Sequence, residues 1–349
     1  MKRFLSSLLP LVLVLLLALP ALSLAEEERA LNILTWADYI HGPTILEPFE
    51  KETGIRVNYN YFDSNEEMLI KLQADKAGSY DIILASDYII DIARNEGLIL
   101  PLDKALLPNW DNIDPVFQNQ FFDPENEYTV PYVAGTPLII YDPAYIDIPI
   151  TGYNSFWDES LADSLVIMDD ARNVIGITLK SMGYSFNVTD PDVLAAAEEK
   201  LMALKQNIRL LDYNTPHQAM ISGEATIGYM FTPGILWSLE ERPDLMVVYP
   251  EEGMGFGIDS LFIPANAPRP GNAHAFLDFL LRPEIGVNIA EYQAYINCNR
   301  AAEPLLSQEF KSNPALYIPM KILGETEFIQ DVGDAQLIYN DIWTRFKQY

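Results

Sequence analysis

Residues 31 to 95 alternate between segments typical of strands and segments typical of helices, and this alternation restricts the fold more than any other feature of the chain. The expected strands are continuously apolar or alternate apolar and polar residues, and they cover 31–36, 55–61 and 81–85. The segments between and after them carry apolar residues at helical spacing, and they cover 43–52, 64–77 and 88–95. Strands that alternate with helices in this way form a largely parallel sheet with helices on both faces.

The chain has 349 residues, which is more than one compact core usually holds, so two α/β lobes are expected. Further strands are predicted at 165–168, 226–231 and 259–264, and further helices at 193–205, 273–281, 284–291 and 336–346. No Gly/Ser-rich linker separates the two halves, so we expect the chain to cross between the lobes more than once. The expected division is 26–135 plus 259–303 for lobe 1 and 136–258 plus 304–349 for lobe 2.

The first 25 residues are typical of a secretory signal peptide. A positive start at Lys2 and Arg3 precedes an apolar run, and small residues at Ser23 and Ala25 fit a cleavage site after position 25. An uncleaved membrane anchor is the alternative, although the apolar run is short for a spanning helix. Cys298 is the only cysteine, so no lipid-attachment cysteine lies near the cleavage site and no intrachain disulfide can form. An exported chain without disulfides indicates the bacterial cell envelope, and we expect a periplasmic location.

The chain is strongly acidic. Its formal net charge is −28, and the mature chain reaches −30 because Lys2 and Arg3 leave with the signal peptide. A field of this sign repels nucleic acid and anionic lipid and attracts cations. Solubility alone is the simpler explanation of the charge, so it supports a cationic ligand only in combination with other features.

Carboxylates and aromatic rings follow the carboxyl ends of the predicted strands, where ligands bind in open α/β sheets. These positions are Trp36, Asp38 and Tyr39, then Ser86, Asp87 and Tyr88, then Asp169 and Asp170, then Phe231. Lys and Arg are nearly absent from them, with Arg172 as the nearest exception. A primary ammonium group needs acceptor oxygens, and aromatic faces attract a desolvated cation and cover a methylene chain. A linear diamine therefore suits these residues better than an anion, which would need Arg or a helix N-terminus.

Other chemistry has little support in the sequence. The chain contains no nucleophile elbow, no phosphate-binding P-loop and no dinucleotide fingerprint. The three histidines are scattered, so we expect no metal site, no cofactor and no catalytic residues. Asp169 and Asp170 are adjacent acids that a secreted hydrolase could use, but adjacent side chains usually point apart.

Several motifs resemble the bacterial spermidine/putrescine-binding proteins of ABC importers. The likeness runs in order through LNILTWADYI, YDIILASDY, MDDAR, DSLFIPANAPRPGNAHAFLDFLLRPE and QDVGDAQLIYNDIW, and it covers nearly all of the mature chain. The resemblance implies a type II periplasmic-binding-protein fold, in which two α/β lobes joined by a hinge of crossing segments close over the ligand. It also implies a polyamine ligand and a membrane ABC permease as partners. We expect a monomer that does not bind nucleic acid.

The same resemblance assigns nine ligand-binding residues. The WADY motif provides Trp36, Asp38 and Tyr39, the ASDY motif provides Ser86 and Tyr88, and Asp170, Phe231, Asp259 and Tyr295 complete the set. In relatives, the position of Asp259 forms a salt bridge with a ligand amine. Relatives carry an acid at Asn173, a tryptophan at Gly257 and often at Phe231, and a glutamine at Ile329 in spermidine binders. These departures leave the choice between putrescine and spermidine open.

Most of the assigned residues also have a purely structural alternative. The rings of Trp36, Tyr39, Phe231 and Tyr295 could pack in a core, and Asp38, Ser86 and Asp259 could cap helices or turns. Asp169 competes with Asp170 for the same role, and Asp87 is expected to be a charge at a helix start. Three functions compete: a polyamine receptor, a receptor of the same fold for ferric ion or another organic cation, and a secreted hydrolase.

Overall fold

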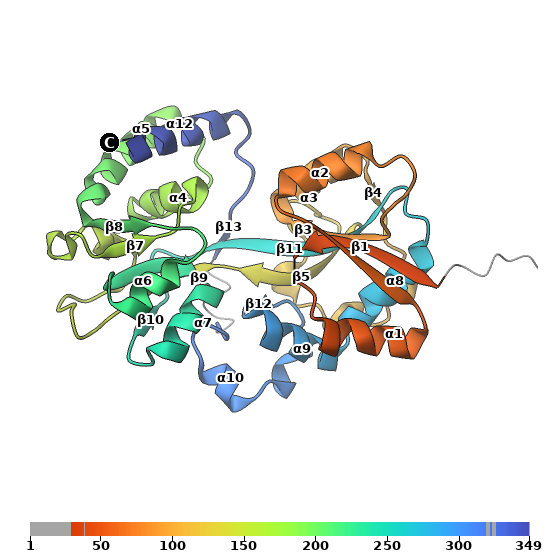
Figure 1. Ribbon diagram of the computed structural model, residues 1–349. Coiled ribbons are helices and arrows are strands. Elements are labelled where there is room, and N and C mark those ends of the chain that lie inside the picture. Colours follow the sequence, from red (N-terminus) through yellow and green to blue (C-terminus); the bar gives the residue numbers. More distant parts are fainter. Residues whose placement is uncertain (1–28, 38, 319–321, 323–325, 349) are drawn as a thin grey trace, which may run out of the picture.

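The computed structural model describes residues 29–37, 39–318, 322 and 326–348. The predicted signal peptide and Asp38 lie outside the described residues. Two sheets form the framework, and Figure 1 shows them in separate lobes, with the ribbons of β5 and β11 running from one lobe toward the other. The sheet of the first lobe has the strand order β12-β5-β11-β3-β1-β2, with β4 and β13 also paired to β11, and the second has the order β10-β6-β9-β7-β8.

The first lobe begins with the predicted parallel strands. β1 (Ala30–Trp36) pairs in parallel with β2 (Arg56–Phe62) and with β3 (Ile82–Ser86), as the sequence predicted. The rest of this sheet is antiparallel, because β11 (Gly255–Pro264) pairs antiparallel with β3 and with β5 (Thr129–Gly135). Three of the five pairings in this strand order are antiparallel, so the prediction of a largely parallel sheet is wrong beyond β1, β2 and β3.

Two features hid the antiparallel strands from sequence analysis. β5 contains Pro131, which normally argues against a central strand, but here Pro131 lies at a register irregularity opposite Ser260. β11 begins at Gly255, four residues before the predicted start, because Gly255 and Gly257 weaken the strand pattern. Pairing with β5 and with β13 (Glu327–Phe328) keeps this glycine-rich start in the sheet.

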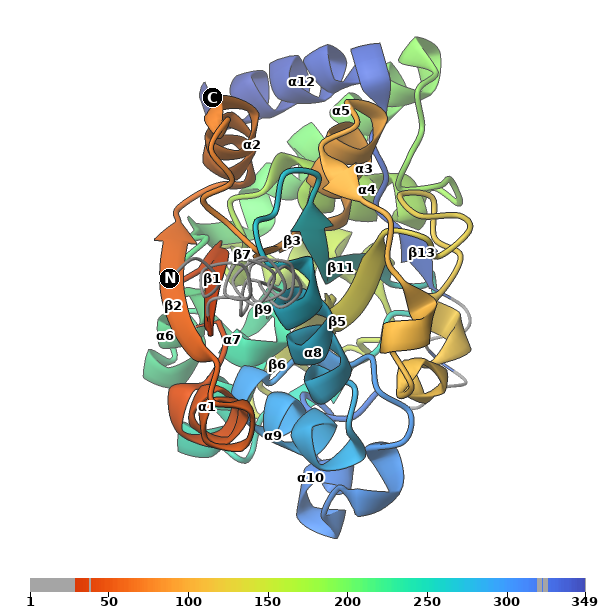
Figure 2. The same ribbon diagram turned by 90° about the vertical axis from the view of Figure 1, so that its right-hand side faces the viewer.

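Helices cover both faces of the first sheet, as Figures 1 and 2 show. On one face α2 (Asn65–Ala74) and α3 (Asp87–Asn95) pack on Leu34 and Ile83. On the other face α1 (Glu47–Thr53) and α8 (Pro270–Leu280) pack on Ile33 and Leu84. Successive residues of a strand point to opposite faces of the sheet, so Leu34 and Ile33, like Ile83 and Leu84, contact helices on opposite sides. Both strands are therefore buried on both faces.

Helix boundaries follow their capping signals. Ser64 accepts a hydrogen bond from the backbone N–H of Glu67 at 3.2 Å and begins α2. α2 ends at Ala74, three residues before its predicted end, because the Asp75 carboxylate accepts backbone N–H groups of the three following turn positions, 77 to 79. Gly54 ends α1 with a positive φ of 70°. A π-helical turn, η1 (Gly42–Leu46), precedes α1.

The second lobe has a five-stranded mixed sheet with its own core. Its strands are β6 (Pro137–Tyr141), β7 (Leu165–Ile167), β8 (Ile208–Leu211), β9 (Ile227–Phe231) and β10 (Met246–Val248). Its helices are α4 (Ala171–Ser181), α5 (Pro191–Leu204), α6 (Pro216–Ser222), α7 (Thr232–Glu241) and α12 (Gln336–Gln348). The predicted strands β7 and β9 and the predicted helices α5 and α12 are confirmed, whereas β6, β8, β10, α4, α6 and α7 were not predicted.

The remaining elements are short or lie in the first lobe. They are α9 (Pro283–Gln293), α10 (Gln308–Ser312), β4 (Ile99–Leu100), β12 (Ile296–Asn297), and the 3-10 turns η2 (Lys104–Leu106), η3 (Trp110–Asn112), η4 (Pro115–Phe117), η5 (Tyr153–Trp157), η6 (Glu159–Leu161), η7 (Lys205–Asn207), η8 (Glu303–Leu305) and η9 (Gly333–Ala335). In the part of the chain that the structure describes, no helix has the length and hydrophobicity needed to cross a membrane.

The described chain passes between the lobes at three places. It goes from β5 to β6 through Thr136, from β10 to β11 through 249–254, and from β13 to α12 through 329–335. α12 then packs on the core of the second lobe through Tyr339 and Phe346. The expectation of repeated crossings is confirmed.

A fully buried ion pair fastens α8 to the first sheet. Asp81, at 0% exposure, accepts hydrogen bonds from the backbone N–H groups of Asn32 and Arg269 and lies 2.9 Å from a guanidinium nitrogen of Arg269. Removing one member of such a pair leaves a buried charge without its counter-ion, which typically costs about 3–5 kcal/mol.

We therefore expect Arg269→Ala to lower the free energy of unfolding by about 3–5 kcal/mol in urea titrations. Arg282→Ala is the matched control, because Arg282 pairs with Glu52 on the surface at 2.7 Å and should lose no more than about 1 kcal/mol. Equal losses in the two variants would contradict the special role of the buried pair.

Candidate functional site

A cavity of about 990 Å³ lies between the two lobes. Eight of the nine predicted site residues line it: Trp36, Tyr39, Ser86, Tyr88, Asp170, Phe231, Asp259 and Tyr295. Asp38 is the ninth and lies outside the described residues. The structure therefore brings together side chains from positions 36 to 295 at one cavity, with Asp170 and Phe231 on the second lobe and the others on the first.

Asp259 is the central acid of this cavity. It lies in β11 at the register irregularity, with Ser86 and Val133 as its neighbours across the sheet. Ser86 Oγ donates a hydrogen bond to Asp259 Oδ1 at 2.7 Å, and the Tyr39 hydroxyl donates one to Oδ2. Among the described residues no Lys or Arg forms an ion pair with it. Its carboxylate is therefore held only by neutral donors.

Burial sets the electrostatics of this cluster. Burial raises the pKa of Asp259, and the hydrogen bonds from Tyr39 and Ser86 lower it in part. Burial also raises the pKa of Tyr39 well above its usual range, and the negative charge of Asp259 raises it further. Tyr39 is therefore a neutral donor, and Asp259 lacks a cation that would favour its ionised form.

Tyr59 of β2 positions the WADY turn. Its hydroxyl donates to the carbonyl of Trp36 at 2.8 Å and accepts the backbone N–H groups of Tyr39 at 2.9 Å and Ile40 at 3.2 Å. The ring of Trp36 packs edge-on against Phe62, with the ring centroids 4.5 Å apart. The turn after β1 is therefore fixed by the neighbouring strand, which directs Tyr39 toward Asp259.

Ser86 and Tyr88 extend the first-lobe wall. Ser86 precedes α3 but makes no capping hydrogen bond with its side chain, so the capping alternative for Ser86 is wrong. The Tyr88 hydroxyl accepts from Asn65 and donates to Glu66 Oε1, both at 3.1 Å. Glu66 also lines the cavity, but in the sequence it stood out only as part of a helix-capping motif.

Asp87 is a second carboxylate that lines the cavity near Asp259. It is 3% exposed, and it accepts the backbone N–H of Ile258 at 3.0 Å and that of Tyr88 at 2.7 Å. Burial is the main cause that raises the pKa of Asp87 to about 7, and the nearby charge of Asp259 adds to the effect. Asp87 starts α3, as expected, but it also fixes the backbone of β11 next to Asp259.

Asp169 and Asp170 point apart. Asp170 lines the cavity and caps α4 by accepting the N–H of Asn173 at 2.9 Å. Asp169 instead accepts from Trp343 Nε1 at 3.1 Å and pairs with Lys347 at 3.0 Å. The two carboxylates therefore cannot act together on one substrate, and only Asp170 is available to a ligand in the cavity.

Aromatic rings of both lobes meet beside Gly135 at the first crossing. A Cβ atom at this glycine would lie 3.4 Å from the ring of Tyr295 and 3.7 Å from that of Phe231. At Gly257, where the family resemblance leads us to expect a tryptophan in relatives, an added Cβ would meet only Asp87 Oδ2, at 3.8 Å. Phe256 does not replace the missing ring fully, because its side chain is buried and packs toward Phe328.

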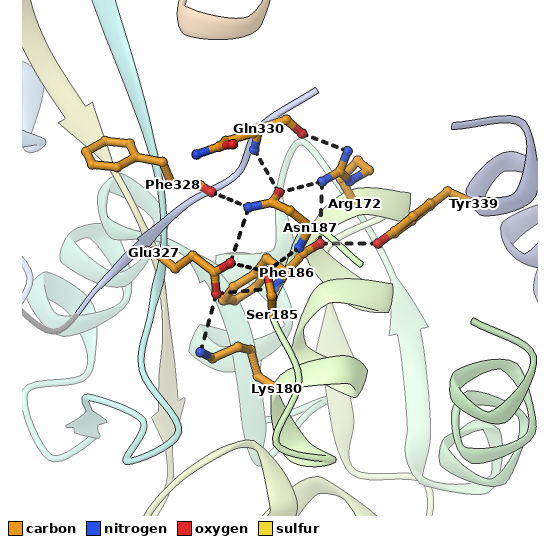
Figure 3. Close-up of polar contacts among 9 residues, drawn as sticks. All are labelled: Arg172, Lys180, Ser185, Phe186, Asn187, Glu327, Phe328, Gln330 and Tyr339. Atoms are coloured by element: carbon orange, nitrogen blue, oxygen red, sulfur yellow. Dashed lines mark hydrogen bonds and ion pairs between the residues drawn. The ribbon is translucent and has the colours of Figure 1, made fainter. Parts of the chain in front are cut away.

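Arg172 lines the cavity, but its guanidinium group is engaged elsewhere. It donates to the Gln330 carbonyl and to Asn187 Oδ1, each at 3.0 Å, and lies 4.7 Å over the ring of Tyr339. Figure 3 shows these contacts in a network that continues from Asn187 to the carbonyl of Phe328 at 2.7 Å. Arg172 therefore fastens the third crossing to the second lobe, and this network does not pair it with Asp259.

Sequence analysis missed Tyr213, which also lines the cavity. Tyr213 follows β8, a short strand with the sequence IRLL that was not predicted. Because β8 runs parallel to β7, its carboxyl end lies at the same edge as Asp170, and predicting this strand would have identified Tyr213. No cluster of three potential metal ligands among His, Cys, Asp and Glu occurs among the described residues.

We expect Asp87→Asn to change the pH dependence of stability. A buried carboxyl with a raised pKa stabilises the fold while protonated, and this contribution falls as the pH rises from the unfolded value near 4 toward 7. Between pH 5.5 and 8 the wild type should lose roughly 2 kcal/mol relative to the variant. Urea unfolding of the wild type and of Asp87→Asn at both pH values measures the difference between their free energies of unfolding. If this difference is the same at pH 5.5 and pH 8, the raised pKa of Asp87 is contradicted.

The chain is similar to known solute-binding proteins along most of its length. A family model described as bacterial extracellular solute-binding protein matches residues 44–318. The chain is 38% identical over 324 residues to the spermidine/putrescine-binding periplasmic protein of Salmonella typhimurium, with 93% of each chain covered. It is 31% identical over 356 residues to the putrescine-binding periplasmic protein PotF of Escherichia coli, with 95% of each covered.

A solved structure shares the fold over nearly the whole chain. The spermidine/putrescine ABC transporter substrate-binding protein PotD of Streptococcus pneumoniae superposes with a TM-score of 0.84 at 34% identity, covering 92% of this chain and 99% of that one. The predicted fold and the predicted resemblance are confirmed by these likenesses. The chain belongs to the family of bacterial extracellular solute-binding proteins.

Proposed function

We propose that this protein is a periplasmic receptor that captures a polyamine, putrescine or spermidine, and delivers it to an ABC permease without catalysing a reaction. The observation that carries the proposal is the environment of Asp259, a carboxylate in the cavity between the lobes that has only the neutral donors Tyr39 and Ser86 as partners. The names of the relatives support the same ligand class. Export by cleavage of residues 1–25 and action as a monomer are part of the proposal.

The proposed site consists of the nine predicted residues. One ammonium group of the ligand pairs with Asp259 and gives it the positive partner that the described chain does not supply. Asp38 and Asp170 provide further acceptor oxygens for the remaining amines. The rings of Trp36, Tyr295 and Phe231 cover the methylene chain, where each desolvated cation–ring contact contributes about 0.5–2 kcal/mol.

Ligand capture is proposed to follow from lobe closure. The lobes are proposed as 26–135 plus 259–303 and 136–258 plus 304–349, joined by the three crossings. Leu306 and Phe310 nevertheless pack with Ala290 of α9, so residues 304–318 lie on the first-lobe side of the third crossing. Asp170 and Phe231 lie on one lobe and Asp259 on the other, so a ligand that contacts all three binds the closed arrangement better than the open one. That difference in affinity is what shifts the population toward closure.

The competing functions find less support in the geometry. Ferric ion bound by tyrosines would require phenolate oxygens, whereas burial raises the pKa of both Tyr39 and Tyr295. A hydrolase that used Asp169 and Asp170 together would require them to face one substrate, whereas Asp169 is turned toward Trp343 and Lys347.

Asp259→Asn should weaken putrescine or spermidine binding by about 2–5 kcal/mol, because a buried ammonium loses its ionic partner. Titration calorimetry of the mature protein against a chain-length series of amines measures the change. Asp169→Asn is the matched control, since this acid does not line the cavity, and it should bind as the wild type does. A wild-type protein that binds no polyamine at millimolar concentration would refute the receptor proposal.

Binding of a cationic amine should release protons near neutral pH. Asp259 has a raised pKa and Asp87 a pKa of about 7, and a cation next to them favours their ionised forms. We expect the affinity to rise between pH 5.5 and 8. Calorimetry at pH 7 in two buffers with different ionisation enthalpies counts the protons released, and identical binding enthalpies in both buffers would contradict the coupling.

A further inference from the structure

Tyr213 lies in a rigid turn at the carboxyl end of β8. The carboxylate of the preceding residue, Asp212, accepts the backbone N–H groups of Asn214 at 2.9 Å and Thr215 at 3.1 Å, and the Thr215 hydroxyl at 2.7 Å. An aspartate that binds its own turn in this way holds the backbone in one conformation. The backbone that carries the Tyr213 side chain is therefore held at this edge of the cavity.

Tyr213 contributes a large ring to the lining of the cavity. Tyr213 lines the cavity yet is 56% exposed, so its side chain stands in the open space between the lobes. Partial removal of the phenol from water raises the pKa of Tyr213, and the charges of Asp170 and then Asp259 raise it further. The Tyr213 phenol is therefore within electrostatic range of an acid on each lobe. Tyr213 in turn contributes to raising the pKa of Tyr295.

The hydroxyl of Tyr213 has no hydrogen-bond partner among the described residues, and its ring is not packed in either core. Tyrosines placed for stability usually bury the ring and satisfy the hydroxyl. Tyr88 satisfies its hydroxyl in the same cavity by contacting Asn65 and Glu66. Tyr213 thus has a free ring face and a free polar end, and both are directed at the ligand space.

We propose that Tyr213 is a specificity-determining residue that narrows the passage between Asp170 and Asp259, so that unbranched aliphatic amines fit and amines with bulky nitrogen substituents are excluded. This inference rests on the proposed polyamine receptor function. An amine chain that joins the two carboxylates has to pass along the ring of Tyr213. The ring face attracts the ammonium ends of a slim chain, whereas methyl groups on nitrogen collide with it.

The test compares two dications of equal chain length, putrescine and its N,N,N′,N′-tetramethyl derivative. Tyr213→Ala should weaken putrescine binding about tenfold, which corresponds to about 1.4 kcal/mol. The same variant should bind the tetramethyl amine as well as the wild type or better, so the wild-type preference for putrescine shrinks at least tenfold. Tyr213→Phe keeps the ring and should retain most of the wild-type preference.

Tyr145→Ala is the matched control, because this tyrosine is 75% exposed and does not line the cavity. It should leave both affinities unchanged. The selectivity role would be overturned if Tyr213→Ala weakened the binding of both amines equally, or if it bound both with wild-type affinity. The receptor function would still stand in that case if Asp259→Asn weakened polyamine binding as expected. Loss of the preference in Tyr213→Phe would overturn the role of the ring. A wild-type protein that binds neither putrescine nor spermidine would end both proposals.

Discussion

A carboxylate that is removed from water without a basic partner is the constraint on which this structure depends. Such an anion is costly unless donors satisfy its oxygens, and Asp259 meets this need through Ser86 of β3 and Tyr39 of the turn after β1. Asp87 adds a second acid behind β11 and holds its backbone. Within the described residues, the first sheet thus supplies neutral hydrogen-bond donors to Asp259 but no positive charge. A cationic ligand can supply that charge, as the proposed receptor function requires.

The sequence allowed much of the first lobe to be predicted, because its strands and helices follow local rules. The periodicity of residues 31–95 predicts β1, β2 and β3, and Ser64 and Gly54 mark helix boundaries close to those observed. The antiparallel half of the sheet escaped prediction for an equally physical reason. Pro131 and the glycines of β11 have weak strand signals, and only long-range pairing keeps them in the sheet.

The site was partly predictable for a different reason. The rule that ligands bind at the carboxyl ends of strands selects Trp36, Ser86 and Asp170, and the family resemblance adds Asp259 and Tyr295. The hydrogen bonds between Asp259, Tyr39 and Ser86 could not be predicted from spacing, since they join positions 173 and 220 residues apart. Tyr213 was missed because β8 is too short to show a periodic pattern.

β11 starts beside β13 and close to Phe186 of the second-lobe core, and it ends within the first sheet. In the proposed closure the lobes rotate about the crossings, and Asp259 lies only five residues after the crossing through 249–254. Points near a pivot move least, so we expect this carboxylate to keep nearly the same surroundings in the open and closed arrangements. The proposal then implies that one end of the ligand binds Asp259 first and that Asp170, which moves with the second lobe, contacts the other end on closure.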